Sequence, residues 1–364
     1  MVPTKEKISI LLAAGIYPPD PGGPALHAKK FHEWLDEQVV ENKIVALSKY
    51  RFLPIGLRHL VYVWKLWRQF SGVDVVYAYD ALGVGLPALI VSKFKRKKLL
   101  IRIGGDIPWE RAAGKNLTDL SMNEWYRAGE HKKSTSFKIS RFILRRTAKI
   151  ITSSDLLSKL YINYYDVNPD KIVTIPNPVP EKTGDSRVAS PRTIIFASRL
   201  VAYKNLSAML DVLSRVLPDF QDVKFVIMGD GPEKKKLQAK SRALNIDKQI
   251  VFLGNILQEE VMRKTAECYI GLAPALTEFN PNYILQCLSF GKPFLISKEN
   301  GLPFNLPEEF LISPRDHSQV EERIRYILSD QGYRQSQEVV RGLDFRLSWD
   351  EILKRNLETI IMLK

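Results

Sequence analysis

Short apolar runs alternate with longer amphipathic segments along most of the chain. The runs have the length of strands, and in the longer segments apolar residues recur every three to four positions, as in helices. Strands that alternate with helices in this way predict a parallel sheet covered by helices on both faces. The predicted strands are residues 8–14, 44–47, 73–78, 99–103, 149–153, 171–175, 193–197, 224–228, 250–253, 269–273 and 293–297, and a helix is predicted over residues 25–38.

A polar stretch interrupts this alternation near the middle of the chain. Residues 181–192 contain Gly184, Pro191 and two serines, a composition typical of a linker. The length of 364 residues also suits two ordinary domains. We therefore predict an α/β fold of two doubly wound, Rossmann-like domains, residues 1–180 and 181–344, that face a central cleft. In such sheets ligands bind beyond the carboxyl ends of the strands.

The composition excludes several classes of protein. Hydrophobic residues make up 45% and charged residues 26% of the chain, which excludes a disordered or collagen-like protein. The two cysteines form no CxxC motif or Cys/His cluster, so neither a disulfide framework nor a zinc site is expected, and a cytoplasmic location is the default. The most apolar window, residues 81–91, is far shorter than the ~20 residues that span a bilayer. We therefore expect no integral membrane protein.

Positive charge is concentrated in the N-terminal half. Residues 1–180 carry 28 of the 54 Lys and Arg residues but only 16 of the 40 Asp and Glu residues, a net charge of +12 out of +14. Two stretches concentrate it, residues 93–98 and residues 51–68, and the second interleaves cations with Trp, Tyr and Leu. Such a helix suits an anionic membrane surface, although an ordinary solvated surface is the simpler alternative. No zinc finger, RNA-recognition signature or basic heptad supports a nucleic-acid partner.

Candidate ligand-binding residues lie in turns that directly follow predicted strands. Gly22 and Gly23 follow the first strand and precede a helix, an arrangement that lets the backbone approach an anion. Arg199 follows the strand over residues 193–197, and Lys204 lies near the start of a helix, so the two cations suit a diphosphate. Each feature also has a simpler interpretation, a ligand-free turn or two surface cations.

Two further turns carry glycine or polar residues. Gly229 follows the strand over residues 224–228, at a place where a ligand can lie close to the backbone. Glu278 lies in the loop after residues 269–273, and Gln286 lies eight residues further on in a helix. Such a loop can present a carboxylate and backbone N–H groups to one ligand. The alternative is a capped helix with a solvated Glu278.

In combination, these segments resemble the family 4 glycosyltransferases of GT-B fold, which retain the anomeric configuration and use nucleotide-sugar donors. The resemblance covers nearly the whole chain, and it also implies that residues 345–364 form a C-terminal helix that crosses back to the first domain. It rests on the order and spacing of the segments YPPDPGGPALH, ITSSDLLSKLYINYYDVNPDKIVTIPNPV, FASRLVAYKN, VIMGDGPEKKKLQ, IVFLGNILQEEV, EFNPNYILQCLSFGKP and SWDEILKRNLETI.

The resemblance implies a role for each candidate residue. Arg199 and Lys204 match the pair that neutralises the donor diphosphate, and Glu278 matches the first acid of the E-x7-E motif, near the transferred sugar. Gly22 and Gly23 match the loop close to the donor phosphate and the acceptor. The implied donor-binding groups in the second domain further include Gly229 and the residues Phe279, Asn280, Asn282 and Gln286.

The implied chemistry needs no metal and no cofactor besides the nucleotide-sugar co-substrate. In this fold, retention is usually explained by same-face attack, in which the departing phosphate helps to deprotonate the acceptor. That scheme needs no protein nucleophile. The chain also has no D-x-D motif, so the metal-dependent alternative fold loses support.

The sequence departs from the family pattern at two places. Gln286 stands where the family has the second acid of E-x7-E, which accepts the ribose hydroxyls, so the charge-assisted part of that contact is lost. Gly104 and Gly105 stand where the family often has His-Gly, so a His contact to the sugar is missing. The following Asp106 is a candidate to orient or deprotonate an acceptor hydroxyl, or else a helix cap.

We therefore expect a hexosyltransferase-type enzyme that moves a sugar to a lipid-linked or polysaccharide acceptor in cell-envelope glycan synthesis. We expect it to act in the cytoplasm, peripherally on the inner face of the membrane. The departures at Gln286 and Gly104 motivate an alternative, a degenerate GT-B protein that serves as a partner or scaffold. Another GT-B enzyme, a sugar epimerase or a phosphorylase, is a third possibility.

Overall fold

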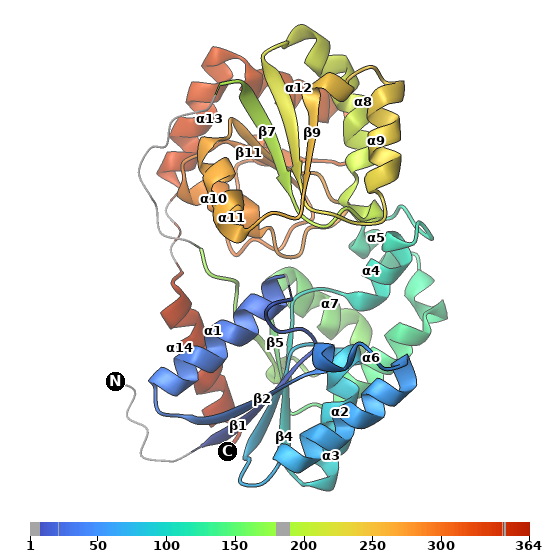
Figure 1. Ribbon diagram of the computed structural model, residues 1–364, viewed down its shortest axis with the longest axis vertical. Coiled ribbons are helices and arrows are strands. Elements are labelled where there is room, and N and C mark those ends of the chain that lie inside the picture. The colour runs from blue at the N-terminus through green and yellow to red at the C-terminus, as the bar shows by residue number, and fades with distance from the viewer. Residues whose placement is uncertain (1–7, 21, 180–189, 344, 346) are drawn as a thin grey trace. The chain divides into compact units, whose positions relative to one another are not determined.

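The computed structural model describes residues 8–20, 22–179, 190–343, 345 and 347–364. Its internal contacts divide the chain into two compact units. Unit 1 comprises Met1–Pro108, Gly129–Pro176 and Trp349–Lys364, and unit 2 comprises Trp109–Ala128 and Asn177–Ser348 (Figure 1). Each unit is an α/β structure, which confirms the predicted fold class.

The described part of unit 1 is built on a six-stranded sheet in the order β2-β1-β3-β4-β5-β6. Every neighbouring pair is parallel. The inner strands are apolar because helices cover both faces of the sheet. The strands are β1 (Ser9–Ala14), β2 (Glu41–Ala46), β3 (Val75–Ala78), β4 (Lys98–Ile103), β5 (Lys149–Thr152) and β6 (Ile172–Thr174).

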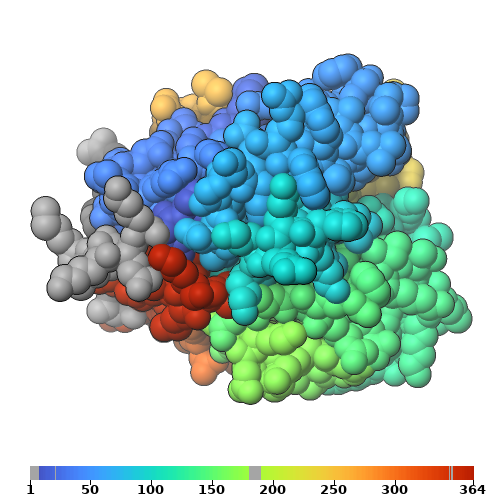
Figure 2. Space-filling model, turned by 90° about the horizontal axis from the view of Figure 1, so that it is seen from below, coloured from blue at the N-terminus to red at the C-terminus, as the bar shows by residue number. Residues whose placement is uncertain are grey.

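The helices of unit 1 include the C-terminal helix α14, which lies beside α1 (Figure 1). The Trp34 indole of α1 donates to the Asp350 carboxylate over 2.8 Å, and the Tyr77 hydroxyl of β3 donates to Asn356 over 2.6 Å. Seen from below, the red C-terminal residues lie against the blue and green surface of this unit (Figure 2). The helices are α1 (Gly23–Glu37), α2 (Ile55–Gln69), α3 (Leu86–Phe94), α6 (Thr135–Arg146), α7 (Asp155–Tyr165) and α14 (Trp349–Ile361).

The described part of unit 2 has a second six-stranded parallel sheet in the order β12-β11-β10-β7-β8-β9. The chain starts in the middle at β7, proceeds to β9 at one edge, and returns to β10 on the other side of β7. The strand order therefore reverses between β7 and β10, which makes this gap the topological switch point of the sheet. The strands are β7 (Arg192–Ala197), β8 (Val223–Met228), β9 (Ile250–Gly254), β10 (Ile270–Ala273), β11 (Phe294–Ser297) and β12 (Leu311–Ile312).

Helices cover both faces of this sheet as well (Figure 1), and a large cluster of buried apolar side chains packs between the layers. In α8, for example, the buried residues recur every three to four positions, which is why this segment packs as an amphipathic helix. The helices are α4 (Ile107–Gly114), α5 (Met122–Arg127), α8 (Leu206–Val216), α9 (Lys234–Ala243), α10 (Gln258–Glu267), α11 (Asn282–Ser289), α12 (His317–Leu328) and α13 (Asp330–Gly342).

The units differ from the expected division in their boundaries, after Pro176 and Ser348, and in the placement of one segment. Residues 109–128, which we call the strap, carry most of α4 and all of α5, and they pack with unit 2. Most of the predicted linker, residues 181–192, lies outside the described residues, as does the predicted boundary at residue 344. The two-residue strand β12 was not predicted because so short a run carries no periodicity.

Candidate functional site

The strand order of unit 2 brings two predicted groups of site residues together. Arg199 and Lys204 follow β7, and Glu278 follows β10. The two strands are parallel neighbours, with Ile194 paired to Ile270, so the loops at their carboxyl ends share one edge of the sheet. This edge is the switch point, where open α/β sheets bind their ligands.

Lys204 and Glu278 form a buried ion pair at this edge. The Lys204 Nζ donates to the Glu278 Oε2 over 2.6 Å, and the two side chains are 9% and 5% exposed. The backbone holds Glu278 from both sides, because its N–H donates to the Glu299 carbonyl over 3.0 Å and its carbonyl accepts from the Gly301 N–H over 2.8 Å. A carboxylate and an ammonium are thus fixed side by side in a setting where unpaired charge is costly.

Arg199 lies in a more open setting beside Tyr203 and Glu110. Its Nη2 donates to the Tyr203 hydroxyl over 3.0 Å and lies 3.4 Å from the Glu110 Oε2. The Tyr203 hydroxyl donates to the same carboxylate oxygen over 3.3 Å. Burial and the Glu110 carboxylate raise the pKa of the Tyr203 phenol, which therefore stays protonated. Because the Arg199 side chain is 69% exposed, its guanidinium remains accessible to an anion.

The loop after Glu278 is tightly packed. Phe279 is buried edge-on against Trp109, with ring centroids 5.6 Å apart. The side-chain oxygens of Asn280 and Asn282 accept from Asn177 over 3.0 and 3.1 Å. The Asn282 N–H, predicted to face a ligand, donates to the Asn280 carbonyl over 2.8 Å. These contacts hold the loop in place, and the donor-binding roles of its residues stay predictions.

Gln286 lies on α11 with an acceptor that is buried and unused. The residue is 8% exposed, and its Oε1 has no hydrogen-bond partner among the described residues. A buried acceptor without a partner costs about 1–3 kcal/mol. Such an atom is usually explained by a ligand or water that donates to it. Gln286 thus holds a buried acceptor with no partner among the described residues, and its donor-binding role stays a prediction.

The close packing of the backbone around Gly229 leaves no room for a side chain. A Cβ at this position would lie 2.0 Å from the Ser198 carbonyl oxygen, and the backbone φ is +131°. Gly231 is crowded in the same way, since a Cβ there would lie 2.3 Å from the Leu200 oxygen. The turns after β7 and β8 thus pack backbone against backbone, which positions the segment that carries Arg199.

The remaining predicted residues belong to unit 1. Gly22 has a φ of +125°, a backbone conformation that favours glycine, and Gly23 begins α1. The Asp106 carboxylate is fully buried and accepts from the Tyr165 hydroxyl, and its role toward an acceptor hydroxyl stays a prediction. The nearby Tyr161 hydroxyl donates to the Gly105 carbonyl over 2.9 Å.

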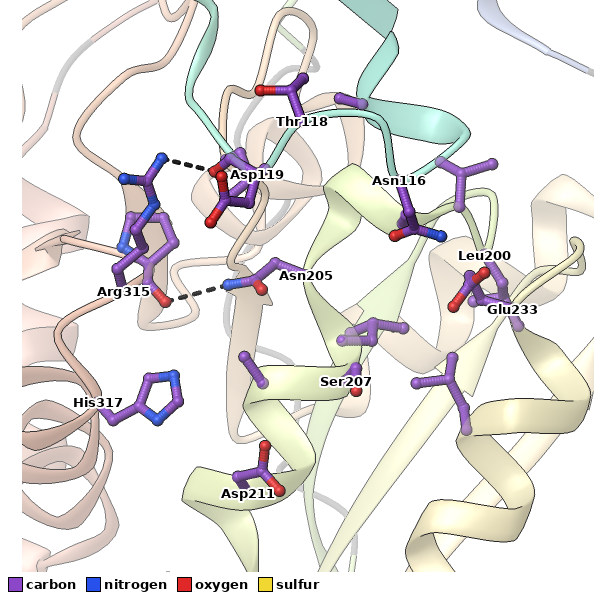
Figure 3. A pocket seen from close by; sticks show the side chains of 18 residues that line it. Asn116, Thr118, Asp119, Leu200, Asn205, Ser207, Asp211, Glu233, Arg315 and His317 are labelled. Carbon is purple, nitrogen blue, oxygen red and sulfur yellow. Dashed lines mark hydrogen bonds between the residues drawn. The ribbon is translucent and has the colours of Figure 1, made fainter. Parts of the chain in front are cut away.

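A cavity of about 370 Å³ lies in unit 2 between the strap and α8 (Figure 3). Asn116, Thr118 and Asp119 of the strap line it, together with Asn205 and Arg315 (Figure 3). The Arg315 guanidinium donates to the Asp119 carbonyl over 2.5 Å, and Asn205 donates to the Pro314 carbonyl over 3.1 Å. The lining does not include Lys204 or Glu278, so the cavity is separate from the ion pair.

Sequence reasoning did not find Glu110, Tyr203 or Glu299 as neighbours of the site. Glu110 comes from the strap and Glu299 from the loop after β11, far from Arg199 and Glu278 along the chain. No local pattern marks Glu110 and Glu299, because they meet the site only through tertiary contacts, whereas Tyr203 directly precedes Lys204 in the chain. Within the described residues, no group of His, Cys, Asp and Glu is arranged to hold a metal ion.

A second candidate surface lies on α2 in unit 1. This helix buries Tyr62 and Leu66, yet Leu57, Leu60, Trp64 and Trp67 are exposed. These four residues are spaced by three, four and three positions, so they form one apolar stripe on the outer side of the helix. In the part of the chain that the structure describes, no helix has the length and apolar character needed to cross a bilayer.

Cations surround this stripe. The Lys65 ammonium and the Arg68 guanidinium lie 4.9 and 5.1 Å from the centre of the Trp64 ring, and the Lys95 ammonium lies 4.0 Å from the Trp67 ring. Phe94, at the end of α3, is 75% exposed and meets Trp67 edge-on. Solvent-exposed tryptophans next to Lys and Arg form the combination expected of a membrane-interface surface.

Comparison with known proteins covers both halves of the chain. Residues 16–182 match the family described as Glycosyltransferase Family 4, and residues 181–339 match the one described as Glycosyl transferases group 1. Curated relatives include the phosphatidylinositol N-acetylglucosaminyltransferase gpi3 subunit of Schizosaccharomyces pombe, 25% identical over 47% of this chain, and its Saccharomyces cerevisiae counterpart, 24% identical over 48%. The chain spans only 38% and 41% of the length of these two proteins.

Solved structures match over nearly the full length. Anabaena HepE in complex with UDP and glucose has a TM-score of 0.74 at 17% identity, covering 98% of this chain and all of that one. Sucrose-phosphate synthase of Thermosynechococcus elongatus has a TM-score of 0.75 at 14% identity, covering 98% and 99%. These likenesses show the fold, and the two family matches together span residues 16–339. The chain belongs to the family 4 glycosyltransferases of GT-B fold.

Proposed function

We propose that this protein is a retaining glycosyltransferase that binds a nucleotide-sugar donor in unit 2. The observation that carries the proposal is the buried Lys204–Glu278 pair at the switch point of the sheet. Lysine and glutamate are rarely buried this deeply in a protein core. A charged ligand that binds at the pair would explain why both residues are found here.

In this proposal Arg199 and Lys204 bind the donor diphosphate. Each cation is now paired with a carboxylate, Arg199 with Glu110 and Lys204 with Glu278. An incoming diphosphate would compete for both cations, and their charge would then stabilise the nucleoside diphosphate as it departs. We propose that this neutralisation does not depend on a metal ion.

Glu278 and Gln286 would contact the two sugars of the donor. Glu278, released from part of its contact with Lys204, would lie near the transferred hexose. Gln286 would accept one ribose hydroxyl through its Oε1, which has no partner among the described residues, and this contact is worth about 1 kcal/mol. The solved structures of Anabaena HepE contain UDP, UDP with glucose, or UDP-glucose, which supports UDP as the first nucleotide to test.

We further propose that the acceptor is lipid-linked or a growing glycan and is met at the membrane surface. The exposed stripe of α2 and the surrounding cations support docking on anionic lipid. We propose that this lipid lies on the cytoplasmic side of the membrane. The names of the two yeast relatives, which describe a phosphatidylinositol N-acetylglucosaminyltransferase, support a lipid acceptor. A role in cell-envelope glycan synthesis fits this arrangement.

Binding of nucleoside diphosphates tests the proposal. Calorimetry with UDP, GDP and ADP should detect binding of at least one, and the same nucleotide should raise the melting temperature. Ligand at 100 times its Kd stabilises a protein by about 2.7 kcal/mol. Release of that nucleotide from its sugar conjugates would then identify the donor. Binding without any turnover would favour the non-catalytic alternative, and binding of none would contradict the proposal.

A further inference from the structure

One contact between the strap and the candidate site is made by the carboxylate of Glu299. This residue follows β11 and is half-buried. The Ser121 hydroxyl donates to its Oε2 over 3.0 Å. Its Oε1 accepts from the Asn123 N–H over 3.0 Å and from the Thr277 hydroxyl over 2.8 Å. Three donors from two separate segments thus converge on one side chain.

The same residue also holds the backbone of Glu278. The Glu299 carbonyl accepts from the Glu278 N–H over 3.0 Å, and Asn300 pairs with Glu278 as a short parallel bridge. Thr277, directly before Glu278, is fully buried, and its hydroxyl oxygen accepts from the Met122 N–H over 2.8 Å. The strap, the Glu278 loop and the loop after β11 are therefore tied together at residues 277 and 299.

This arrangement restricts where the Glu278 carboxylate can lie. Its backbone is bonded to Glu299, the residue before it is bonded to the Glu299 carboxylate, and its own carboxylate is bonded to Lys204. Loss of the Glu299 carboxylate would remove one hydrogen bond from Thr277 and two from the start of α5 at the same time. The Glu278 loop would keep its backbone bonds, the Met122–Thr277 bond and the contact with Lys204, but it would lose the side-chain link between Thr277 and Glu299.

We infer that Glu299 is a positioning residue, which sets the orientation of Glu278 by binding the strap and Thr277 through one carboxylate. The inference rests on the proposed transferase function, because it assigns Glu299 to the same site. Since the Glu299 carboxylate binds Ser121, Asn123 and Thr277, its effect on the reaction is transmitted through the Glu278 loop. In this way the strap helps to hold the loop that carries Glu278.

Glu299→Gln is the direct test, because the amide keeps the size of the side chain but presents an N–H₂ group to donors. We expect kcat to fall by about 10- to 100-fold, as for a misplaced catalytic group, while the Kd for UDP stays within about twofold. Thr277→Val should lower kcat in the same way. Thr277→Ser should keep kcat near the wild-type value, since serine retains the hydroxyl. Glu308→Gln, which removes the nearby exposed partner of Lys298, is the matched control.

Amide hydrogen exchange provides a readout that does not need activity. In Glu299→Gln, exchange at residues 277–282 should become faster than in the wild type, with residues 223–228 of β8 unchanged. Wild-type kcat and unchanged exchange in both Glu299→Gln and Thr277→Val would overturn the inference while leaving the transferase proposal intact. A parallel loss of UDP affinity would also overturn it, by assigning Glu299 to donor binding. If wild-type protein binds no nucleotide, the proposed function fails, and the exchange result still decides the positioning role.

Discussion

Lys204 and Glu278 lie 74 residues apart in the chain and meet through a hydrogen bond of 2.6 Å in a nearly buried ion pair. Removing one member leaves the other charged group buried without its partner, which typically costs about 3–5 kcal/mol. Both residues therefore contribute to stability as well as to the proposed chemistry. The sequence alone did not predict this double role, because it placed Glu278 in a loop without a partner.

Glu278→Gln should lower transfer severely and also lower the melting temperature. The amide cannot balance the Lys204 charge, and it cannot act as a carboxylate near the transferred sugar. Transfer assays together with thermal unfolding measure the two effects. Asp230→Asn, which breaks the exposed Lys234–Asp230 pair, serves as a control and should leave the stability nearly unchanged. Wild-type turnover in Glu278→Gln would exclude a catalytic role.

Arg199→Ala should weaken transfer without loss of stability. Its side chain is 69% exposed, so the ion pair with Glu110 contributes little to folding. Loss of a charge-stabilising donor should reduce kcat/KM by about 10²–10³-fold. Arg263→Ala, at an exposed ion pair on α10, is the control. Equal activity of the two variants would show that Arg199 does not bind the donor phosphates.

Gln286→Glu should tighten donor binding by up to about 10-fold, or ~1.4 kcal/mol, because a carboxylate accepts both ribose hydroxyls. The free protein should become less stable, since the new charge would occupy a site where Oε1 has no partner among the described residues. Calorimetry with UDP, GDP and ADP on both proteins measures the first effect. Weaker binding in the variant would mean that the amide is matched to a different donor.

Leu60→Ser and Trp64→Ser should reduce binding to anionic vesicles. Both side chains belong to the exposed stripe of α2, and each cation nearby is worth about 1 kcal/mol at an anionic surface. Co-sedimentation should also decrease as salt rises through the screening range. Leu257→Ser is a matched control, because Leu257 is 78% exposed but lies in unit 2. Salt-independent binding, or equal loss in the control, would argue against α2 as the docking surface.

The free energy of unfolding of unit 1 should decrease as the pH falls below neutral, because His27 is buried in its neutral form. It is buried beside Tyr79 and Trp349, and desolvation, followed by the Arg102 charge, holds the pKa of its imidazole well below the ordinary value. Below about pH 6.5 the His27 imidazole binds a proton in the unfolded chain but stays neutral in the folded chain. The free energy of unfolding therefore decreases as the pH falls below this value. Urea titrations at about pH 7.5, 6.5 and 5.5 should show this slope in the wild type. His27→Phe should flatten it, and an unchanged slope would exclude His27 as its source.

The local pattern of residues was sufficient to predict most of the strands and the first helix. Strand β8 was expected over residues 224–228 and forms over Val223–Met228, and the helix expected over residues 25–38 forms over Gly23–Glu37. The periodic spacing of apolar residues shows which side of a helix or strand is buried. Because this spacing repeats every two to four residues, it can be recognised in a single sequence. The same order of segments carried the resemblance to the family, which the comparisons confirm.

The strand order and the contacts that depend on it were decided by the tertiary structure. The strand order of unit 2, in which β10 lies beside β7, cannot be read from the sequence. Glu278 meets Lys204 only because these two strands are neighbours. Packing of the strap against unit 2 likewise connects Ser121 to Glu299 across 178 positions. Residue types and local spacing therefore determined which elements form and which side chains are candidates for chemistry. Their pairing depended on long-range packing, because hydrogen bonds between distant segments leave no periodic trace in the chain.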